Sequence, residues 1–199
     1  ITNLKKILGL ETGKKYKDTK SLRYGKVMIM TDQDHDGSHI KGLVMNMFHH
    51  MWPSLLELGY ITSMITPIVK VSKKKKIKSF YTLTEYNDWQ KKTKDYKQWK
   101  CKYYKGLGTS NSEEARDYFK NIKLNNYYCN ENTSNSINLA FSKDLSDKRK
   151  EWLYEFNENN ILDHCKKDIS IDEFINKELI HFSNSDTLRS IGSLYDGLK

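Results

Sequence analysis

The sequence predicts an α/β fold, on two observations. Short apolar runs bounded by polar clusters, which are typical of buried strands, alternate with segments whose apolar residues recur at helical spacing. Of the 199 residues 37% are hydrophobic, enough for the core of one large domain, or of a medium domain with part of another. The segments expected to form strands are residues 26–31, 60–71, 77–83 and 99–105.

The first strand leads into the most regular predicted helix. Apolar residues after Gly37 follow an i, i+3, i+4, i+7, i+8, i+11 series, which predicts a helix that packs on one face. Pro53 can begin a further turn and Gly59 can end it. The residues of the series are Ile40, Leu43, Val44, Met47, Phe48 and Met51.

The middle of the chain predicts a hairpin followed by two helices. The lysine run at residues 73–76 is expected to form the turn between two strands. Residues 84–92 are expected to form a helix. Ser110 and Glu113 have the spacing of a capping box, which predicts the start of a second helix. The apolar residues of that helix are Ala115, Tyr118, Phe119 and Ile122.

The last third of the chain predicts more helix and less strand. Residues 125–136 are rich in Asn and Ser and are expected to form a loop. Residues 144–157 predict a helix, and the polar residues 157–168 predict a linker. Ser170 and Glu173 form a second candidate capping box.

Charge favours an acidic partner. The net charge is +9, and the excess lies in residues 1–26, with eight Lys/Arg against two acids, and residues 70–105, with thirteen Lys against three acids. Nucleic acid is the commonest acidic partner, and a solvated lysine-rich surface explains the charge equally well.

Cysteine usage and hydropathy exclude several classes of protein. The three cysteines are widely spaced and lack a CxxC pair, which argues against a zinc site and a disulfide framework. No apolar run approaches the roughly 20 residues that span a membrane. The chain does not begin with Met and ends abruptly, so we expect an internal fragment.

The strongest chemical signal is an acidic cluster directly after the first strand. Asp32, Asp34 and Asp36 alternate there, and in extended chain such residues point the same way. Three carboxylates so close together repel one another unless cations neutralise them, and Mg²⁺ favours such oxygen ligands. Two ions that share a carboxylate can bind the attacking and leaving oxygens of a phosphodiester displacement.

Other interpretations of the cluster stay open. A calcium EF-hand loop has Glu at its twelfth position, where this chain has Leu43. A haloacid-dehalogenase phosphatase also places Asp-x-Asp after a strand, and a purely structural loop with Lys41 nearby needs no metal. His39, in the first turn of the following helix, suits a DNA phosphate contact or an ordinary surface position.

The stretch from Leu22 to Gly42 closely resembles the TOPRIM domain of eukaryotic-type DNA topoisomerase II. Further similar stretches follow in the same order, so that the resemblance spans essentially the whole chain. These are residues 65–71, 102–109, 139–143, 148–153 and 174–186.

The resemblance implies an ATP-dependent enzyme that cuts one DNA duplex, passes a second through the break and reseals it. It implies Mg²⁺, two ions per site in the intact enzyme, with Asp32 as the shared ligand, Asp34 as a further ligand and Asp36 as a supporting carboxylate. Double-stranded DNA, a homodimer, an ATP-binding domain outside this chain and a nuclear location are likewise implied.

DNA contacts follow from the same resemblance. Arg149, Lys150 and Lys199 match DNA-contacting positions of the family. Independently of the resemblance, Lys105 beside Gly106 and Gly108 could approach a phosphate, and a solvated strand end explains it equally well. Gly192 stands where the family usually has Pro.

The resemblance implies a largely parallel sheet flanked by helices and three divisions of the chain. They are a TOPRIM domain at 1–140, a helical connector at 141–165 and the start of a winged-helix domain at 166–199. The family's metal-binding glutamate and its attacking tyrosine are expected outside the chain, which alone is therefore expected to be inactive. A non-catalytic Mg²⁺- and DNA-binding module and a stand-alone phosphoryl-transfer enzyme are the alternatives.

Overall fold

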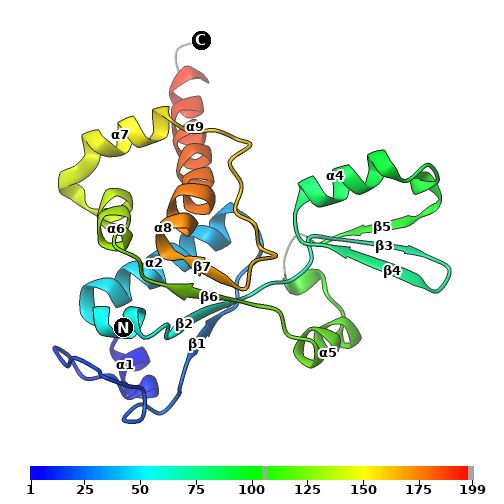
Figure 1. Ribbon diagram of the computed structural model, residues 1–199. Coiled ribbons are helices and arrows are strands. Elements are labelled where there is room, and N and C mark those ends of the chain that lie inside the picture. Colours follow the sequence, from blue (N-terminus) through cyan, green and yellow to red (C-terminus); the bar gives the residue numbers. More distant parts are fainter. Residues whose placement is uncertain (105–106, 197–199) are drawn as a thin grey trace.

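A computed structural model describes residues 1–104 and 107–196, without the side chains of Leu107 and of residues 191–196. The chain forms two sheets that stand side by side, each with its own helices (Figure 1). The strands are β1 (Val27–Ile29), β2 (Ile61–Met64), β3 (Val69–Lys73), β4 (Lys76–Phe80), β5 (Lys100–Tyr103), β6 (Leu124–Tyr128) and β7 (Asp168–Ser170). The α-helices are α1 (Thr2–Leu8), α2 (His35–Met51), α3 (Pro53–Glu57), α4 (Leu83–Lys92), α5 (Ser112–Lys120), α6 (Thr133–Phe141), α7 (Ser146–Tyr154), α8 (Ile171–Phe174) and α9 (Ile180–Asp196). Short 3₁₀ turns are η1 (Tyr96–Gln98), η2 (Leu107–Thr109) and η3 (Lys143–Leu145), and η4 (Ile175–Leu179) is a π-helical turn.

The larger sheet has the order β1-β2-β6-β7. β1 runs parallel to β2, β6 runs antiparallel to β2, and β7 runs parallel to β6. Helices α6 to α9 lie above this sheet in Figure 1 and α1 lies below β1, while α2 packs against α6 and α9. The expected α/β class, with a largely parallel sheet flanked by helices, is confirmed.

The expected loop at residues 125–136 is wrong, because β6 crosses the middle of the sheet there and α6 begins at Thr133. Asn residues are poor strand formers, but tertiary contacts satisfy them here. The Asn125 amide donates to the Lys166 carbonyl at 2.5 Å, and the buried Tyr127 hydroxyl lies 2.9 Å from Ser63 Oγ. Strand formation at β6 therefore depends on partners that lie far away in the sequence.

Helix α2 forms where its apolar period predicts it, but it buries a different face. Ile40 and Leu43 are 49% and 46% exposed, whereas Lys41 is only 2% exposed. The core lies on the side of Met45 and Phe48, where Phe48 packs against aromatic side chains of the following segment. A buried lysine thus replaces part of the predicted apolar stripe.

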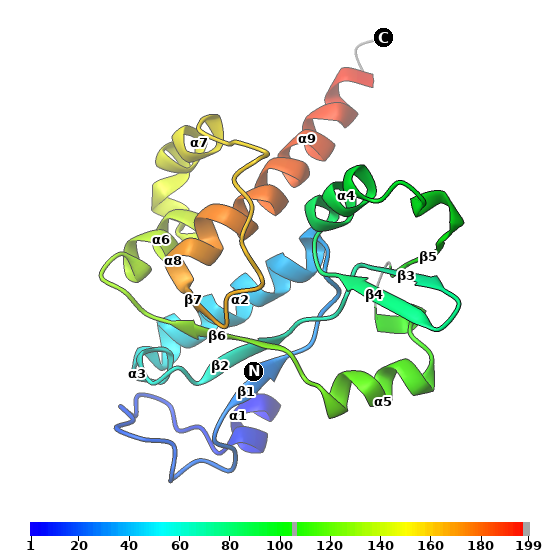
Figure 2. The same ribbon diagram turned by 45° about the vertical axis from the view of Figure 1, so that its right-hand side comes forward.

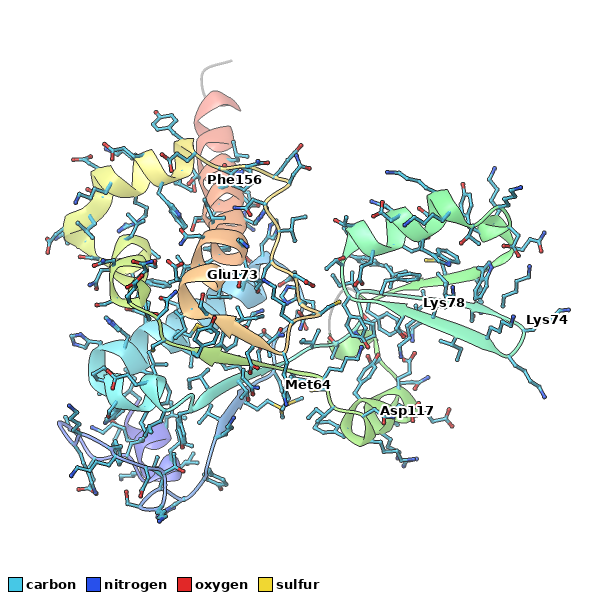
Figure 3. The ribbon with its side chains drawn as sticks, in the orientation of Figure 1. Met64, Lys74, Lys78, Asp117, Phe156 and Glu173 are labelled. Atoms are coloured by element: carbon cyan, nitrogen blue, oxygen red, sulfur yellow. The ribbon has the colours of Figure 1, made fainter. Side chains whose placement is uncertain are left out.

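The smaller sheet, with the order β4-β3-β5, carries α4 on one face and stands beside the larger sheet (Figure 2). Its small core consists of Val69, Val71 and Phe80, packed against aromatic side chains that include Trp89. The expected lysine turn is confirmed, since Lys73 pairs with Lys76 and Lys74 takes a positive φ of 55° at the tip of the hairpin, far from the larger sheet (Figure 3).

Two boundaries in this region differ from the prediction. The single strand expected at 60–71 is split into β2 and β3, because Pro67 lies between them and cannot donate to a ladder. The capping box of α5 is formed by Asn111 and Glu114, one residue later than the predicted pair. At the second candidate capping box, Ser170 Oγ accepts from the Glu173 amide at 3.0 Å, which begins α8 as expected.

The C-terminal part shares a core with the N-terminal part. Trp152, Leu162 and Phe174 belong to the same buried cluster as Leu8 and Phe48. The divisions at 140 and 165 therefore stay predictions. Within the described part of the chain, no helix is long and apolar enough to cross a membrane.

Candidate metal and DNA site

The acidic residues lie at the junction between β1 and α2. Asp34 is the N-cap of α2, and its Oδ1 accepts the Gly37 amide at 2.8 Å. Asp36 lies in the first helical turn, so the three carboxylates do not alternate along one extended strand as expected. Negative charge at this end of a helix is favoured by the exposed amides and by the helix dipole. The helix start, and not a strand edge, organises the cluster.

Neighbouring elements hold this junction in place. The Gln33 side-chain amide donates to the Met64 carbonyl at the end of β2, at 3.1 Å. The guanidinium of Arg189, on α9, lies 3.4 Å from Asp36 Oδ1 and 3.3 Å from Asp186 Oδ1. The acidic end of α2 is thus tied to the sheet and faces the C-terminal helix.

The described residues offer oxygen ligands of the type that a hard cation binds, but too few of them for a complete site. Asp34 uses one oxygen as a helix cap and keeps the other, and carboxylate oxygen is what Mg²⁺ prefers. Among the residues that the structure describes, no three His, Cys, Asp or Glu side chains come together as ligands. The chain therefore offers part of a Mg²⁺ site.

A cleft of about 510 Å³ opens beside the acidic residues. One wall is the β1–α2 junction, a second is the start of α4, and a third comes from the C-terminal helices. Its polar lining residues include Gln33, Asp34, Asp36, Ser38, His164, Lys177, Glu178, His181 and Arg189.

Glu178, which the sequence did not single out, lies in this lining and is bound from α2. Its Oε1 accepts the Ser38 hydroxyl at 2.6 Å and also binds the Lys41 ammonium. Burial acts to raise the pKa of Glu178, but the charge of Lys41 and these hydrogen bonds leave that pKa below its usual range. Glu178 is therefore an ionised carboxylate inside the fold. Its partner Lys41 lies outside the apolar series predicted for this helix, so no local sequence pattern pointed to Glu178.

The candidate DNA contacts are dispersed. His39 stacks on Phe182, with ring centroids 4.1 Å apart, and is half-buried. Arg149 Nε donates to the Leu139 carbonyl at 3.1 Å and its Nη2 to the Ser142 carbonyl, so this guanidinium closes the end of α6. Exposed Lys150 pairs with Asp147 at 2.8 Å.

His39 lies on α2 near the acidic residues, whereas Arg149 and Lys150 lie on α7. Two further candidates, Lys105 and Lys199, lie outside the described residues. The assignment of DNA contacts therefore stays a prediction.

The chain matches the protein family described as "C-terminal associated domain of TOPRIM" over residues 64–187. It is 50% identical to DNA topoisomerase 2-beta of Gallus gallus and 49% identical to DNA topoisomerase 2-alpha of Homo sapiens. Both matches cover 100% of this chain, but only 13% and 14% of those relatives.

A solved structure gives the same result. The Plasmodium falciparum topoisomerase II DNA-binding, cleavage and re-ligation domain superposes with a TM-score of 0.90 at 47% identity. The superposition covers 95% of this chain and 26% of that one. Sequence and fold agree along nearly the whole chain, and the chain belongs to the eukaryotic-type DNA topoisomerase II family, through its TOPRIM-associated region.

Proposed function

We propose that this chain supplies Mg²⁺-binding carboxylates and DNA contacts for the double-strand cleavage and resealing steps of an ATP-dependent type II DNA topoisomerase. The observation that carries the proposal is the acidic start of α2 beside an open cleft, in a chain about half identical to topoisomerase 2 along its whole length. The chain spans about one seventh of those relatives, so the activity is proposed for the whole protein.

Asp32 and Asp34 would hold the ion, and Asp36 would support them. Bound Mg²⁺ would supply positive charge that stabilises the leaving 3′-oxygen of the cut strand. Asp34 is held by its bond to the Gly37 amide, which fixes where its second oxygen points before any ion arrives. The ion would complete its ligand shell with groups that this chain does not provide.

The basic residues would grip the DNA backbone. Arg149, Lys150, Lys105, Lys199 and His39 would contact phosphates, which positions DNA without reading its sequence. Arg149 has five N–H donors and uses two on carbonyls, so it retains donors for a phosphate. Such contacts release counterions and weaken as salt rises.

The remaining features belong to the proposed whole enzyme. We propose that it works as a homodimer in the nucleus, that ATP binds a separate domain, and that a tyrosine outside this chain attacks the phosphodiester. The isolated chain is then inactive.

The test is a chimera in which this chain replaces the matching segment of human DNA topoisomerase 2-alpha. We expect Mg²⁺-dependent DNA cleavage by the chimera, and loss of cleavage with Asp32→Ala. A folded chimera that binds DNA but never cleaves it contradicts the proposal.

A second candidate function is a non-catalytic Mg²⁺- and DNA-binding module. The incomplete ligand set among the described residues favours it for the isolated chain. Calorimetry with Mg²⁺ on the chain and on the Asp32→Ala/Asp34→Ala variant separates the cases. Weak binding that the double variant abolishes supports a preformed partial site, and no binding by either protein contradicts the module.

A further inference from the structure

A buried ion pair joins the acidic helix to the C-terminal helical segment. Lys41 on α2 and Glu178 on η4 bind each other with side-chain exposures of 3% and 10%. The Lys41 ammonium also lies 5.7 Å from the centre of the Phe174 ring, which covers it from α8. A buried charge is costly unless it is paired, so each member of this pair holds the other in place.

Side chains pack closely on α2 beside this pair. A Cβ at Gly42 would lie 3.0 Å from the Phe141 ring and 3.2 Å from the Leu179 side chain. Glu178 is part of a π-helical turn, a rare geometry that occurs often at functional sites. The neighbouring Ile175 and Leu179 are buried in the core, and Glu178 contacts α2.

The firm partners of Glu178 all come from the first two turns of α2. Ser38 Oγ donates to its Oε1 at 2.6 Å, and the Ser38 amide donates to the Asp34 carbonyl at 3.1 Å. Glu178 is therefore two hydrogen bonds away from the backbone of the N-cap. Movement of Glu178 would therefore first displace the turn that carries Asp34 and Asp36.

The other carboxylate oxygen is bound less firmly. Glu178 Oε2 is buried and has no hydrogen-bond partner within the part of the chain that is described. The Nε2 atom of His164 lies 3.6 Å from this oxygen. The Asn125 side-chain amide donates through its nitrogen to the Lys166 carbonyl. The side-chain oxygen of Asn125 therefore faces His164 Nδ1, at 3.3 Å. Because this oxygen can only accept, His164 carries a proton on Nδ1.

In its neutral form, with the proton on Nδ1, His164 presents a lone pair and not a donor to Glu178. Burial lowers the pKa of His164, which agrees with the neutral form. Among the described residues, the hydrogen bonds that the Glu178 carboxylate accepts come from Ser38 and Lys41, both on α2.

We infer that Glu178 is a positioning residue, which holds the acidic N-terminal turn of α2 in the geometry that Mg²⁺ requires by binding Ser38 and Lys41. The inference rests on the proposed function, because it takes Asp34 and Asp36 to act on the ion. In this role Glu178 acts through Ser38 and Lys41 and is not itself a ligand of the ion. Residues that orient metal ligands in this way affect metal affinity strongly.

The first experiment uses this chain without metal or DNA. Hydrogen exchange is measured on the wild type, on Glu178→Gln and on the control Glu173→Gln, in which the lost carboxylate pairs with Lys166 and Lys177 instead (Figure 3). We expect amides 37–40 to exchange about tenfold faster in Glu178→Gln only, with the amides of β2 and β6 unchanged. Equal protection in all three proteins overturns the inference.

The second experiment uses the chimera with human DNA topoisomerase 2-alpha. We expect Glu178→Gln to raise the Mg²⁺ concentration for half-maximal cleavage about tenfold, with non-covalent DNA binding unchanged. Ser38→Ala, which leaves the ion pair intact, is expected to give a smaller shift, and it serves as the test if Glu178→Gln does not fold.

The outcomes separate the two proposals. Loss of stability with an unchanged Mg²⁺ requirement overturns the positioning role and leaves the proposed function standing. A wild-type chimera that never cleaves overturns the proposed function, while the hydrogen-exchange result still decides whether Glu178 holds the turn.

Discussion

The carbonyl oxygen of Asp32 occupies the space in which any residue other than glycine at position 37 would place its Cβ. That Cβ would lie 2.0 Å from the oxygen, far inside van der Waals contact. The loop that carries the acidic residues and the first turn of α2 therefore pack directly on each other. This contact by itself requires glycine at position 37.

Gly37→Ala should destabilise the chain by at least about 2 kcal/mol, because the backbone of the acidic loop must move. Thermal or urea unfolding measures the effect. Gly25→Ala is the matched control, since no atom lies within 4 Å of its Cβ position. Equal stability of Gly37→Ala and the wild type would show that the loop packs differently.

Asp34 combines two roles that substitutions can separate. Asp34→Ala removes the helix cap and should cost about 1 kcal/mol of folding free energy. Asp34→Asn keeps an oxygen for the Gly37 amide, so its stability should stay near that of the wild type, while Mg²⁺ binding is lost with the charge. Urea unfolding and calorimetry are run on both variants. Retained Mg²⁺ binding in Asp34→Asn would contradict the assignment of Asp34 as a ligand.

Glu114 should make the stability of the chain depend on pH below neutrality. Burial acts to raise its pKa, but hydrogen bonds from Lys102 and Tyr104 lower the pKa to about 2. Since the folded pKa lies below the unfolded value near 4.5, the stabilisation is complete above about pH 4.5 and is lost as pH falls toward about 2. Glu114→Gln should therefore be less stable at pH 7, by about 2 kcal/mol, and match the wild type near pH 2.

Urea unfolding at several pH values measures the Glu114 effect. The neighbouring Glu113→Gln is the control, because that side chain is exposed and lies in the same helical turn. A stability difference for Glu114→Gln that does not shrink as pH falls would contradict the assigned cause.

Arg149 and Lys150 should behave differently although they are neighbours. Arg149→Ala leaves the carbonyls of Leu139 and Ser142 without their donor and should cost about 1–2 kcal/mol. Lys150→Ala removes only an exposed ion pair and should leave stability close to that of the wild type.

The same two variants test DNA contact. If each residue binds one phosphate, each substitution in the chimera should reduce the slope of log affinity against log salt by about one unit. An unchanged slope for Arg149→Ala, together with lost stability, would assign that residue to the structure of α6 alone.

The α/β class, the α2 helix and the lysine hairpin could be predicted from local pattern, because apolar spacing and turn residues act within a few positions of the chain. The acidic cluster was also visible as a run of carboxylates after a strand. The arrangement of the cluster could not be predicted from this run. It depends on Asp34 capping α2 and on Gly37 packing against the Asp32 carbonyl.

Other features depend on partners distant in the sequence. β6 forms from Asn-rich chain because β2 and the segment before β7 satisfy its polar groups. The buried face of α2 runs through Lys41 because Glu178, 137 residues away, compensates its charge.

The sequence by itself determined the family, the order of most elements and the acidic motif, because these depend on residue identity and local spacing. Only the tertiary structure decided which face of α2 is buried, which Asn residues join a strand, and that the Glu178 carboxylate binds α2 beside the acidic residues. The physical reason is that burial of polar groups is favourable only when their partners are present, and the partners of Lys41 and Asn125 come from distant segments.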